Sequence, residues 1–294
     1  MDTIPLSSRE QKKLQNVQMI ALLEVDRLCK KHNIRYFLAF GTLLGAVRHH
    51  GFIPWDDDVD ITMPRDDMLR FVSICKDELD SGFFIQTPET ESEYSLPIIR
   101  LRVNGTKCVE FDFKEVNMHN GIFVDIYPCD NVPDSQFKRF TYKYISKYLI
   151  TSVNICQGVY VQHLHLFKKC VAYILSSPLR LMNKSMRIKL RDGYLSKWNQ
   201  CNTRDVVVQD GRGLVWKYIY PHEFIDSVEY MDFEGMSLPC SKLYKNMLSQ
   251  MYGDYMALPP VDKRRQHHGF LQLDFGKYES DEYVNTILLK YMKV

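Results

Sequence analysis

The sequence of 294 residues lacks paired cysteines. Its eight cysteines occur singly, with no C-x-x-C pair and none near a histidine at the spacing of a zinc finger. A disulfide framework and a cysteine-based zinc site are therefore not indicated. Scattered single cysteines in a chain of this length are typical of small buried residues in a reducing compartment.

A secretory leader and a membrane-spanning run are missing as well. Residues 1–13, MDTIPLSSREQKK, contain no apolar stretch, so they do not have the form of a signal peptide. No uninterrupted apolar run approaches the roughly 20 residues that cross a bilayer. We expect a cytoplasmic protein, either free or bound peripherally at the inner face of the membrane.

The chain has no large excess of charge of one sign. Its 38 lysines and arginines nearly balance 36 aspartates and glutamates, for a net charge of +2. This balance argues against a nucleic-acid partner. Apolar residues make up 45% and charged residues 25%, which is ordinary for a globular protein with a buried core.

The residue pattern predicts a mixture of helices and strands. Residues 7–33 have helical periodicity, a capping box of Ser7 and Glu10, and Asn33 as a stop. Asn104 and Gly105 form a hairpin-turn signal between two strands. Strands are expected at residues 34–40, 58–63, 83–87, 98–103, 107–111 and 121–128 and near Val206, Val215 and Val228; helices are expected at residues 43–47, 65–79 (capped by Asp66) and 241–252.

The most informative stretch is residues 41–61, GTLLGAVRHHGFIPWDDDVDI. Its four clustered aspartates, Asp56, Asp57, Asp58 and Asp60, repel one another unless a cation lies between them. On a strand, Asp58 and Asp60 would face the same side about 7 Å apart, which suits Mg²⁺ and two-metal phosphoryl transfer. The alternative is a solvated surface pair. Asp56 and Asp57 could form a solvated turn, an interpretation that we favour for Asp57.

Two further features complete this interpretation. Asp125 lies in the apolar strand 121–128, where an unpaired acid would cost several kcal/mol of desolvation. A neighbouring metal would supply its partner, although a satisfied core aspartate is the alternative. Gly41 and Thr42 lie between a strand and a helix, where backbone N–H groups bind phosphate; the alternative is a plain turn.

Residues 41–61 resemble the signature of the LicD family, the cholinephosphotransferases of bacterial surface glycans, which is related to fukutin. Residues 121–130, 233–260 and 263–268 (KRRQHH) continue the resemblance in order. The resemblance covers most of the chain except roughly residues 138–200. It implies an α+β fold with a nucleotidyltransferase-like core, a small mixed β-sheet flanked by helices.

The resemblance also implies an activity. The family transfers phosphocholine, or a related phospho-substituent, from a CDP-linked donor to a sugar hydroxyl, and CMP is released. It implies two Mg²⁺ ions, replaceable by Mn²⁺. The donor headgroup (choline, ethanolamine, glycerol or ribitol) and the acceptor (lipopolysaccharide, teichoic acid, capsule or a lipid-linked precursor) stay open. Alternatives are a nucleotidyltransferase acting on a small-molecule hydroxyl and a non-catalytic binding protein.

Residue roles follow from the resemblance position by position. Asp58 and Asp60 match the metal-binding pair, and Asp125 completes it as the candidate general base. Gly41 and Thr42 match the phosphate-binding turn.

Four further donor contacts are implied by the same resemblance. Arg48 and Arg102 are candidates for binding the donor phosphates, although Arg48 could equally be a surface arginine. His267 and His268 belong to the C-terminal motif, where either one would line the donor pocket. Trp55 is expected to pack and hold its loop.

These features divide the chain into a catalytic core at residues 1–137, a basic helical insertion at residues 138–200, and a part at residues 201–294 that completes the site. Residues 138–198 contain 12 lysines and arginines but one acid, Asp192, with aromatic residues between the cations. We expect this segment to bind an anionic membrane surface or the diphosphate-lipid end of the acceptor. A solvated helical subdomain is the alternative. These aromatic residues include Phe140, Tyr142, Tyr144, Tyr148, Tyr160 and Phe167.

Overall fold

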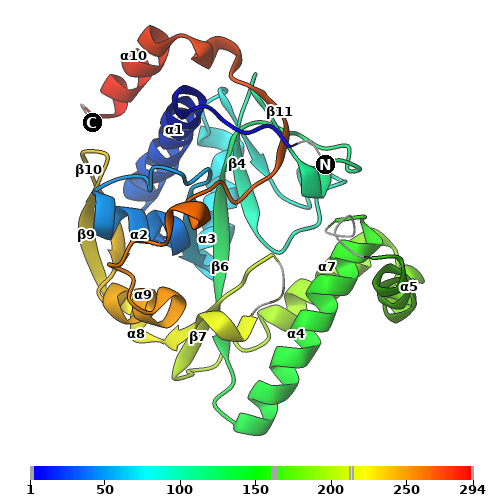
Figure 1. Cartoon of the computed structure of the whole chain (residues 1–294). Coiled ribbons are helices and arrows are strands. Elements are labelled where there is room, and N and C mark those ends of the chain that lie inside the picture. The colour runs from blue at the N-terminus through cyan, green and yellow to red at the C-terminus, as the bar shows by residue number, and fades with distance from the viewer. Residues whose placement is uncertain (1–2, 160–164, 212, 214, 293–294) are drawn as a thin grey trace.

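The computed structural model describes residues 3–159, 165–211, 213 and 215–292; Tyr160 of the basic segment lies outside them. The chain is an α+β protein built around a mixed sheet (Figure 1). Within the described part, its helices are α1 (Ser8–His32), α2 (Phe40–His49), α3 (Arg65–Glu78), α4 (Gln136–Cys156), α5 (Leu166–Leu175), α6 (Ser177–Arg180), α7 (Lys184–Leu195), α8 (Glu223–Asp226), α9 (Tyr244–Tyr252) and α10 (Asp281–Met292).

Among the described residues, the central sheet has seven strands. Five of them follow the order β1-β2-β6-β4-β3, while β7 pairs with β6 and β8 pairs with β7. Only β2 and β6 run parallel; the other neighbours are antiparallel. The strands are β1 (Phe37–Leu38), β2 (Asp60–Pro64), β3 (Phe83–Gln86), β4 (Ile99–Val103), β6 (Phe123–Val132), β7 (Asp205–Val208) and β8 (Ile219–Pro221).

Two small antiparallel pairs lie beside the central sheet. One joins β9 (Val228–Phe233) to β10 (Met236–Ser241). The other joins β5 (Lys107–Glu110) to β11 (Phe270–Asp274), near the end of the chain. The predicted hairpin between residues 98–103 and 107–111 is therefore wrong, because β4 pairs with β3 and β6 instead. The turn itself forms, with Gly105 at φ 75°.

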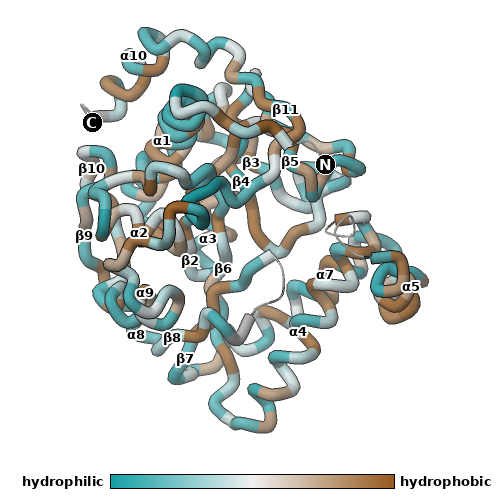
Figure 2. The backbone as a smooth tube through the Cα atoms, viewed as in Figure 1, coloured by the Kyte–Doolittle hydropathy of each residue, from teal (hydrophilic) through white to brown (hydrophobic). Residues whose placement is uncertain are grey.

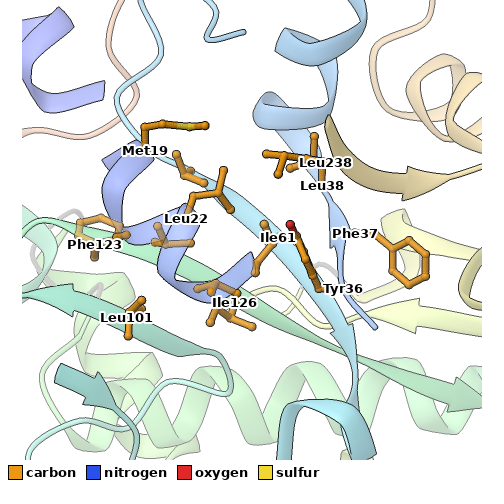
Figure 3. Packing of buried hydrophobic residues seen from close by; sticks show 14 of the residues in the cluster. Met19, Leu22, Tyr36, Phe37, Leu38, Ile61, Leu101, Phe123, Ile126 and Leu238 are labelled. Atoms are coloured by element: carbon orange, nitrogen blue, oxygen red, sulfur yellow. The ribbon is translucent and has the colours of Figure 1, made fainter. Parts of the chain in front are cut away.

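Helix α1 confirms its prediction. Ser7 accepts a hydrogen bond from the backbone of Glu10, whose side chain caps Ser7 in return, and Asn33 ends the helix at φ 51°. The apolar face of α1 packs on the sheet. Met19 and Leu22 of this face lie beside Ile61, Phe123 and Ile126 of β2 and β6 (Figure 3). Burying such a side chain stabilises the fold by about 1.5–3 kcal/mol.

Three local predictions were wrong. The strand expected at residues 34–40 shortens to β1, because α2 already begins at Phe40. Phe40 adopts φ 45°, a strained conformation for a bulky residue, and this turn leads the chain from β1 directly into α2. Asp66 lies in the first turn of α3 rather than at its cap, which is Pro64. Residues near Val215 form a 3₁₀ turn instead of a strand.

The basic segment is helical where it is described. Helices α4 to α7 gather on one side of the molecule, away from α1 and α10 (Figure 1). Helix α4 is anchored by Tyr142 and Ile150, which pack with Leu195 of α7 and with Val132 and Val207 of the sheet. None of the helices in the described ranges is long and apolar enough to cross a membrane.

Candidate active site

Asp60 and Asp125 lie opposite each other on the two parallel strands of the sheet. Asp60 is the first residue of β2, and its register partner on β6 is Asp125. Both are nearly buried, with 6% and 3% of their surface exposed. Oδ1 of Asp60 is buried and has no hydrogen-bond partner among the described residues. A buried carboxylate oxygen without a partner is costly, so this oxygen is available to a ligand.

Asp58 reaches the same region from a loop rather than from a strand. The strand expected at residues 58–63 begins only at Asp60, which corrects the prediction that one strand holds both acids. The negative charges of Asp58 and Asp125 both act on Asp60, after burial as the main cause, to raise its pKa well above the usual range. The three carboxylates therefore share one electrostatic site.

Helix α1 holds the aspartate loop through three glutamines. Gln11 and Gln15 donate to the carbonyl oxygen of Asp56, Gln15 over 3.0 Å, and Gln18 donates to that of Asp57 over 2.8 Å. These glutamines lie at positions i, i+4 and i+7 on the buried face of α1. Sequence analysis missed them, although polar residues at helical spacing on an apolar face were a usable signal.

Asp57 is fully buried, so its predicted place in a solvated turn is wrong. Its carboxylate accepts the backbone N–H of His268 at 2.9 Å and contacts Nδ1 of His268 at 3.1 Å. Burial opposes protonation of His268, but the hydrogen bond to Asp57 and the charge of Asp58 raise its pKa to about 10. His268 is therefore an imidazolium at neutral pH, and it compensates part of the negative charge.

The negative charges of Asp56, Asp58 and Asp60 repel one another. Burial, followed by the charges of Asp58 and Asp57, raises the pKa of Asp56 well above its usual range. Burial also raises the pKa of Asp58, against the effect of His268. Ionised carboxylates in this setting raise the free energy of the folded protein, and a divalent cation would relieve that cost. The open oxygen of Asp60 and the hard oxygen donors fit Mg²⁺.

The residues predicted to bind metal, Asp58, Asp60 and Asp125, differ from a group of possible ligands that lie close together among the described residues. Asp57, Asp58 and His268 each offer one atom, and these atoms lie within 4.8 Å of one another. Asp58 belongs to both sets. An imidazolium cannot bind a metal, so His268 would have to lose its proton before this second set could act as a ligand group.

Asp125 has a protein partner that sequence analysis missed. Arg100, its register partner on β4, donates from Nε to Oδ1 at 2.6 Å and from Nη2 to Oδ2 at 3.3 Å. The same guanidinium binds Glu110 at 2.5 Å. The desolvation argument for a partner was sound, and Arg100 is such a partner. Binding of a metal by Asp125 stays a prediction. No sequence signal shows that β4 pairs with β6.

Gly41 and Thr42 hold the acids in place. A Cβ on Gly41 would lie 2.5 Å from Oδ2 of Asp56, so only glycine lets α2 approach this carboxylate so closely. Thr42 Oγ1 accepts the backbone N–H of Asp60 at 2.9 Å and so sets the start of β2. Both residues lie in the first turn of α2. Their binding of phosphate stays a prediction.

The other three predicted donor contacts lie in different surroundings. Arg48 donates to the carbonyl oxygen of Tyr255 at 3.1 Å and to that of Ala257 at 3.3 Å. Arg102 is fully buried and donates to Gln86 and to the carbonyl oxygen of Gly121; burial and the charge of Arg100 lower its pKa to about 10. This burial disfavours Arg102 as a phosphate ligand. His267 is exposed.

Comparison of the sequence with known proteins relates the chain to a family. A family model described as LicD/FKTN/FKRP, nucleotidyltransferase domain, matches residues 33–153. The lipopolysaccharide cholinephosphotransferase LicD of Haemophilus influenzae is 29% identical over 273 residues, which cover 87% of this chain and 96% of that protein. Residues 33–153 therefore form a LicD-family domain. The chain is an enzyme of the transferase class.

More distant relatives share shorter parts of this chain. An uncharacterized protein of Rickettsia typhi is 35% identical over 109 residues, or 36% of this chain and 32% of that protein. The mannosyltransferase regulator 4 of Saccharomyces cerevisiae is 23% identical over 105 residues, 34% of this chain and 9% of that protein. The family model includes Asp60, Arg100 and Asp125, whereas His268 lies beyond it.

One tyrosine outside the matched domain is affected by the charges of the acids. Tyr252 is the last residue of α9. Burial and then the charges of Asp60 and Asp56 raise its pKa above the usual range, so its hydroxyl stays protonated at neutral pH.

Proposed function

We propose that this enzyme transfers phosphocholine, or a related phospho-substituent, from a CDP-linked donor to a sugar hydroxyl of a bacterial surface glycan or its precursor. The relative from Haemophilus influenzae, a lipopolysaccharide cholinephosphotransferase aligned over 87% of the chain, supports the transferred group and the acceptor class. The observation that carries the proposal is the open oxygen of Asp60 opposite Asp125, because it provides a place for a cation and a diphosphate.

The reaction is a substitution at phosphorus. The acceptor hydroxyl oxygen forms a bond to the phosphorus that bears choline, and the bond from that phosphorus to the bridging oxygen breaks. CMP leaves with the bridging oxygen, and the hydroxyl proton passes to a carboxylate. Asp125 is our candidate for this proton acceptor. Its two contacts with Arg100 hold its carboxylate in a defined position.

We propose that Asp58 and Asp60 hold Mg²⁺, in a nucleotidyltransferase-like core. When bound, the ion neutralises charge on the diphosphate as the bond to CMP breaks. The raised pKa values of Asp58 and Asp60 support the assignment, since carboxylates that are costly to ionise alone gain most from a cation.

The donor phosphates would lie at the start of α2. The first-turn N–H groups at Gly41 and Thr42 and the positive end of the helix dipole suit an anion. The imidazolium of His268, which contacts Asp57, adds a positive charge. Arg48, which binds the loop carbonyls of Tyr255 and Ala257, would hold the C-terminal loop over the donor rather than bind it directly.

An activity assay with a panel of CDP-linked donors tests the proposal. Purified enzyme is incubated with Mg²⁺, a glycan acceptor and a panel of CDP-linked donors carrying choline, ethanolamine, glycerol or ribitol. Mass spectrometry should detect an acceptor heavier by the phospho-substituent together with CMP. The same incubation is repeated with EDTA, which should stop the reaction.

The rival reaction is nucleotidyl transfer. The matched family model, which is described as a nucleotidyltransferase domain, is the reason to consider it. It predicts that labelled CTP places a nucleoside monophosphate on the acceptor and that pyrophosphate is released. Transfer from CTP but from none of the CDP-linked donors would overturn our proposal in favour of this rival.

A further inference from the structure

Helix α5 exposes an apolar surface that the fold does not use. None of its ten residues, all of them described, is buried. Leu166 and Phe167 are each 79% exposed, Ile174 is 69% exposed and Leu175 is 60% exposed. Figure 2 shows α5 as a largely hydrophobic helix at the edge of the molecule. Contiguous exposed apolar residues on a soluble protein mark an interaction site.

Helix α4 continues this surface with aromatic side chains. Phe137, Phe140, Tyr144 and Tyr148 are 77%, 60%, 50% and 38% exposed, and their spacing of three and four residues puts them on one helix face. The hydroxyl of Tyr148 donates to the carbonyl oxygen of Leu175 at 3.1 Å, so the two helices meet there. We call the exposed apolar side chains of these two helices the α4–α5 surface.

Cations surround the α4–α5 surface. Lys138 and Lys147 of α4, Lys168 of α5 and Arg180 of α6 are exposed. The one acid of residues 138–198, Asp192, is bound by Arg191 at 2.8 Å, so it does not neutralise the other cations. The surface therefore combines exposed apolar groups with a positive potential.

We propose that the α4–α5 surface docks on an anionic lipid bilayer, with α5 lying in the plane of the interface. A short amphipathic helix with basic residues binds this way, with its apolar side chains in the acyl boundary and its cations at the lipid headgroups. Aromatic residues such as those of α4 favour the level of the headgroups.

The positive charge around the α4–α5 surface favours a bilayer over a second copy of the chain as its partner. A symmetric dimer would place the same basic patch on both sides of the interface, and facing like charges oppose association. A nucleic-acid backbone would bury little of the apolar surface of exposed aliphatic side chains such as Leu166 and Ile174. An anionic bilayer would bury the apolar side chains in its acyl region and attract the basic side chains to its headgroups.

Vesicle co-sedimentation of the full chain tests this proposal without any substrate, so its outcome does not depend on the proposed reaction. The protein should pellet with vesicles of phosphatidylcholine and phosphatidylglycerol and stay in solution with phosphatidylcholine alone. Added salt should release it, because salt screens the attraction.

Variants then test the named residues. Phe167→Glu with Ile174→Glu should weaken binding at least about tenfold, since two apolar side chains no longer enter the interface. Lys168→Gln and Lys169→Gln should each weaken it about fivefold. Matched controls outside the surface are Val261→Glu, at a 76% exposed residue, and Lys242→Gln with Lys245→Gln. These controls should bind as the wild type does.

Thermal unfolding of each variant checks that the exposed substitutions leave the fold unchanged. Leu166→Glu, at an α5 residue that is 79% exposed, is a second apolar variant should the double variant fold poorly. Equal binding to both lipid mixtures, or wild-type binding by folded Phe167→Glu/Ile174→Glu and Leu166→Glu, would overturn the proposal. A concentration-dependent dimer that Phe167→Glu dissolves would overturn it in favour of self-association.

Discussion

Asp57 and His268 lie 211 positions apart in the sequence, yet Nδ1 of His268 lies 3.1 Å from a carboxylate oxygen of Asp57. The backbone N–H of His268 donates to the other oxygen of the same carboxylate at 2.9 Å. These two contacts tie the C-terminal part of the chain to the aspartate loop. They also explain why an acid can be fully buried beside three others.

Replacing His268 should destabilise the protein in a pH-dependent way. The folded pKa of about 10 lies above the unfolded value near 6.5. The stabilisation is therefore complete below about pH 6.5 and is lost as the pH rises through about 10. His268→Gln should lower the free energy of unfolding by about 3 kcal/mol at neutral pH, since Asp57 then lacks its charged partner.

Urea unfolding of both proteins at pH 7, 8.5 and 10 measures this dependence. His222→Gln is the control, because His222 lies on an exposed helix start with Asp226. An equal difference between wild type and His268→Gln at every pH would contradict a charged His268.

Asp60→Asn should raise the metal-free melting temperature and abolish transfer. The substitution removes one of the mutually repelling charges and leaves the size of the side chain unchanged. In wild type, Mg²⁺ should raise the melting temperature, and in the variant this rise should be much smaller. Differential scanning fluorimetry with and without MgCl₂ measures both effects. Transfer at a tenth of the wild-type rate or more would show that Asp60 is not required to hold the cation.

Gly41→Ala should disturb the site through a steric clash with Asp56. The new Cβ would lie 2.5 Å from the carboxylate of Asp56, and overpacking of this kind costs about 1–3 kcal/mol. We expect a lower melting temperature and at least about a tenfold loss of transfer, since the loop carries the acids. Gly193→Ala in α7 is the control, because no atom lies near its Cβ position; it should stabilise the helix slightly. Equal effects of the two substitutions would exclude the contact as the cause.

Asp125→Asn should preserve the fold and remove most of the activity. Arg100 keeps its contact with Glu110 at 2.5 Å, so the buried guanidinium still has a charged partner. Steady-state rates should fall about 100-fold or more if Asp125 accepts the proton, and the pH dependence of the remaining rate should flatten. Asp66→Asn, at an exposed residue of α3, is the control. Wild-type rates for Asp125→Asn would assign Asp125 a purely structural role.

Arg100→Met should be far more damaging to stability than Asp125→Asn. It leaves Asp125 and Glu110 both buried and without their guanidinium, and breaking a buried pair from one side costs about 3–5 kcal/mol. Chemical denaturation of the two variants compares the costs. Equal losses would mean that the pair contributes through packing of the arginine stem rather than through its charge.

Local interactions were readable from the sequence. Ser7 and Glu10 cap α1 because both partners lie within one helical turn, and Asn33 ends it because asparagine tolerates a positive φ. The clustered aspartates of residues 56–60 pointed to a cation because their repulsion exists in any conformation that keeps them close. Asp125 was recognised as needing a partner because an acid in an apolar strand is costly wherever that strand lies.

Contacts between distant segments needed the tertiary structure. The sequence contains Arg100 and Arg102 as alternating residues of one strand, but only the pairing of β4 with β6 puts Arg100 opposite Asp125. In the same way, β5 could have closed a hairpin with β4, yet it pairs with β11. Strand pairing depends on which apolar faces pack together, and that choice is made by the whole core rather than by neighbours in sequence. His268 precedes β11 by two residues, so the pairing of β5 with β11 helps to position His268 against the buried Asp57.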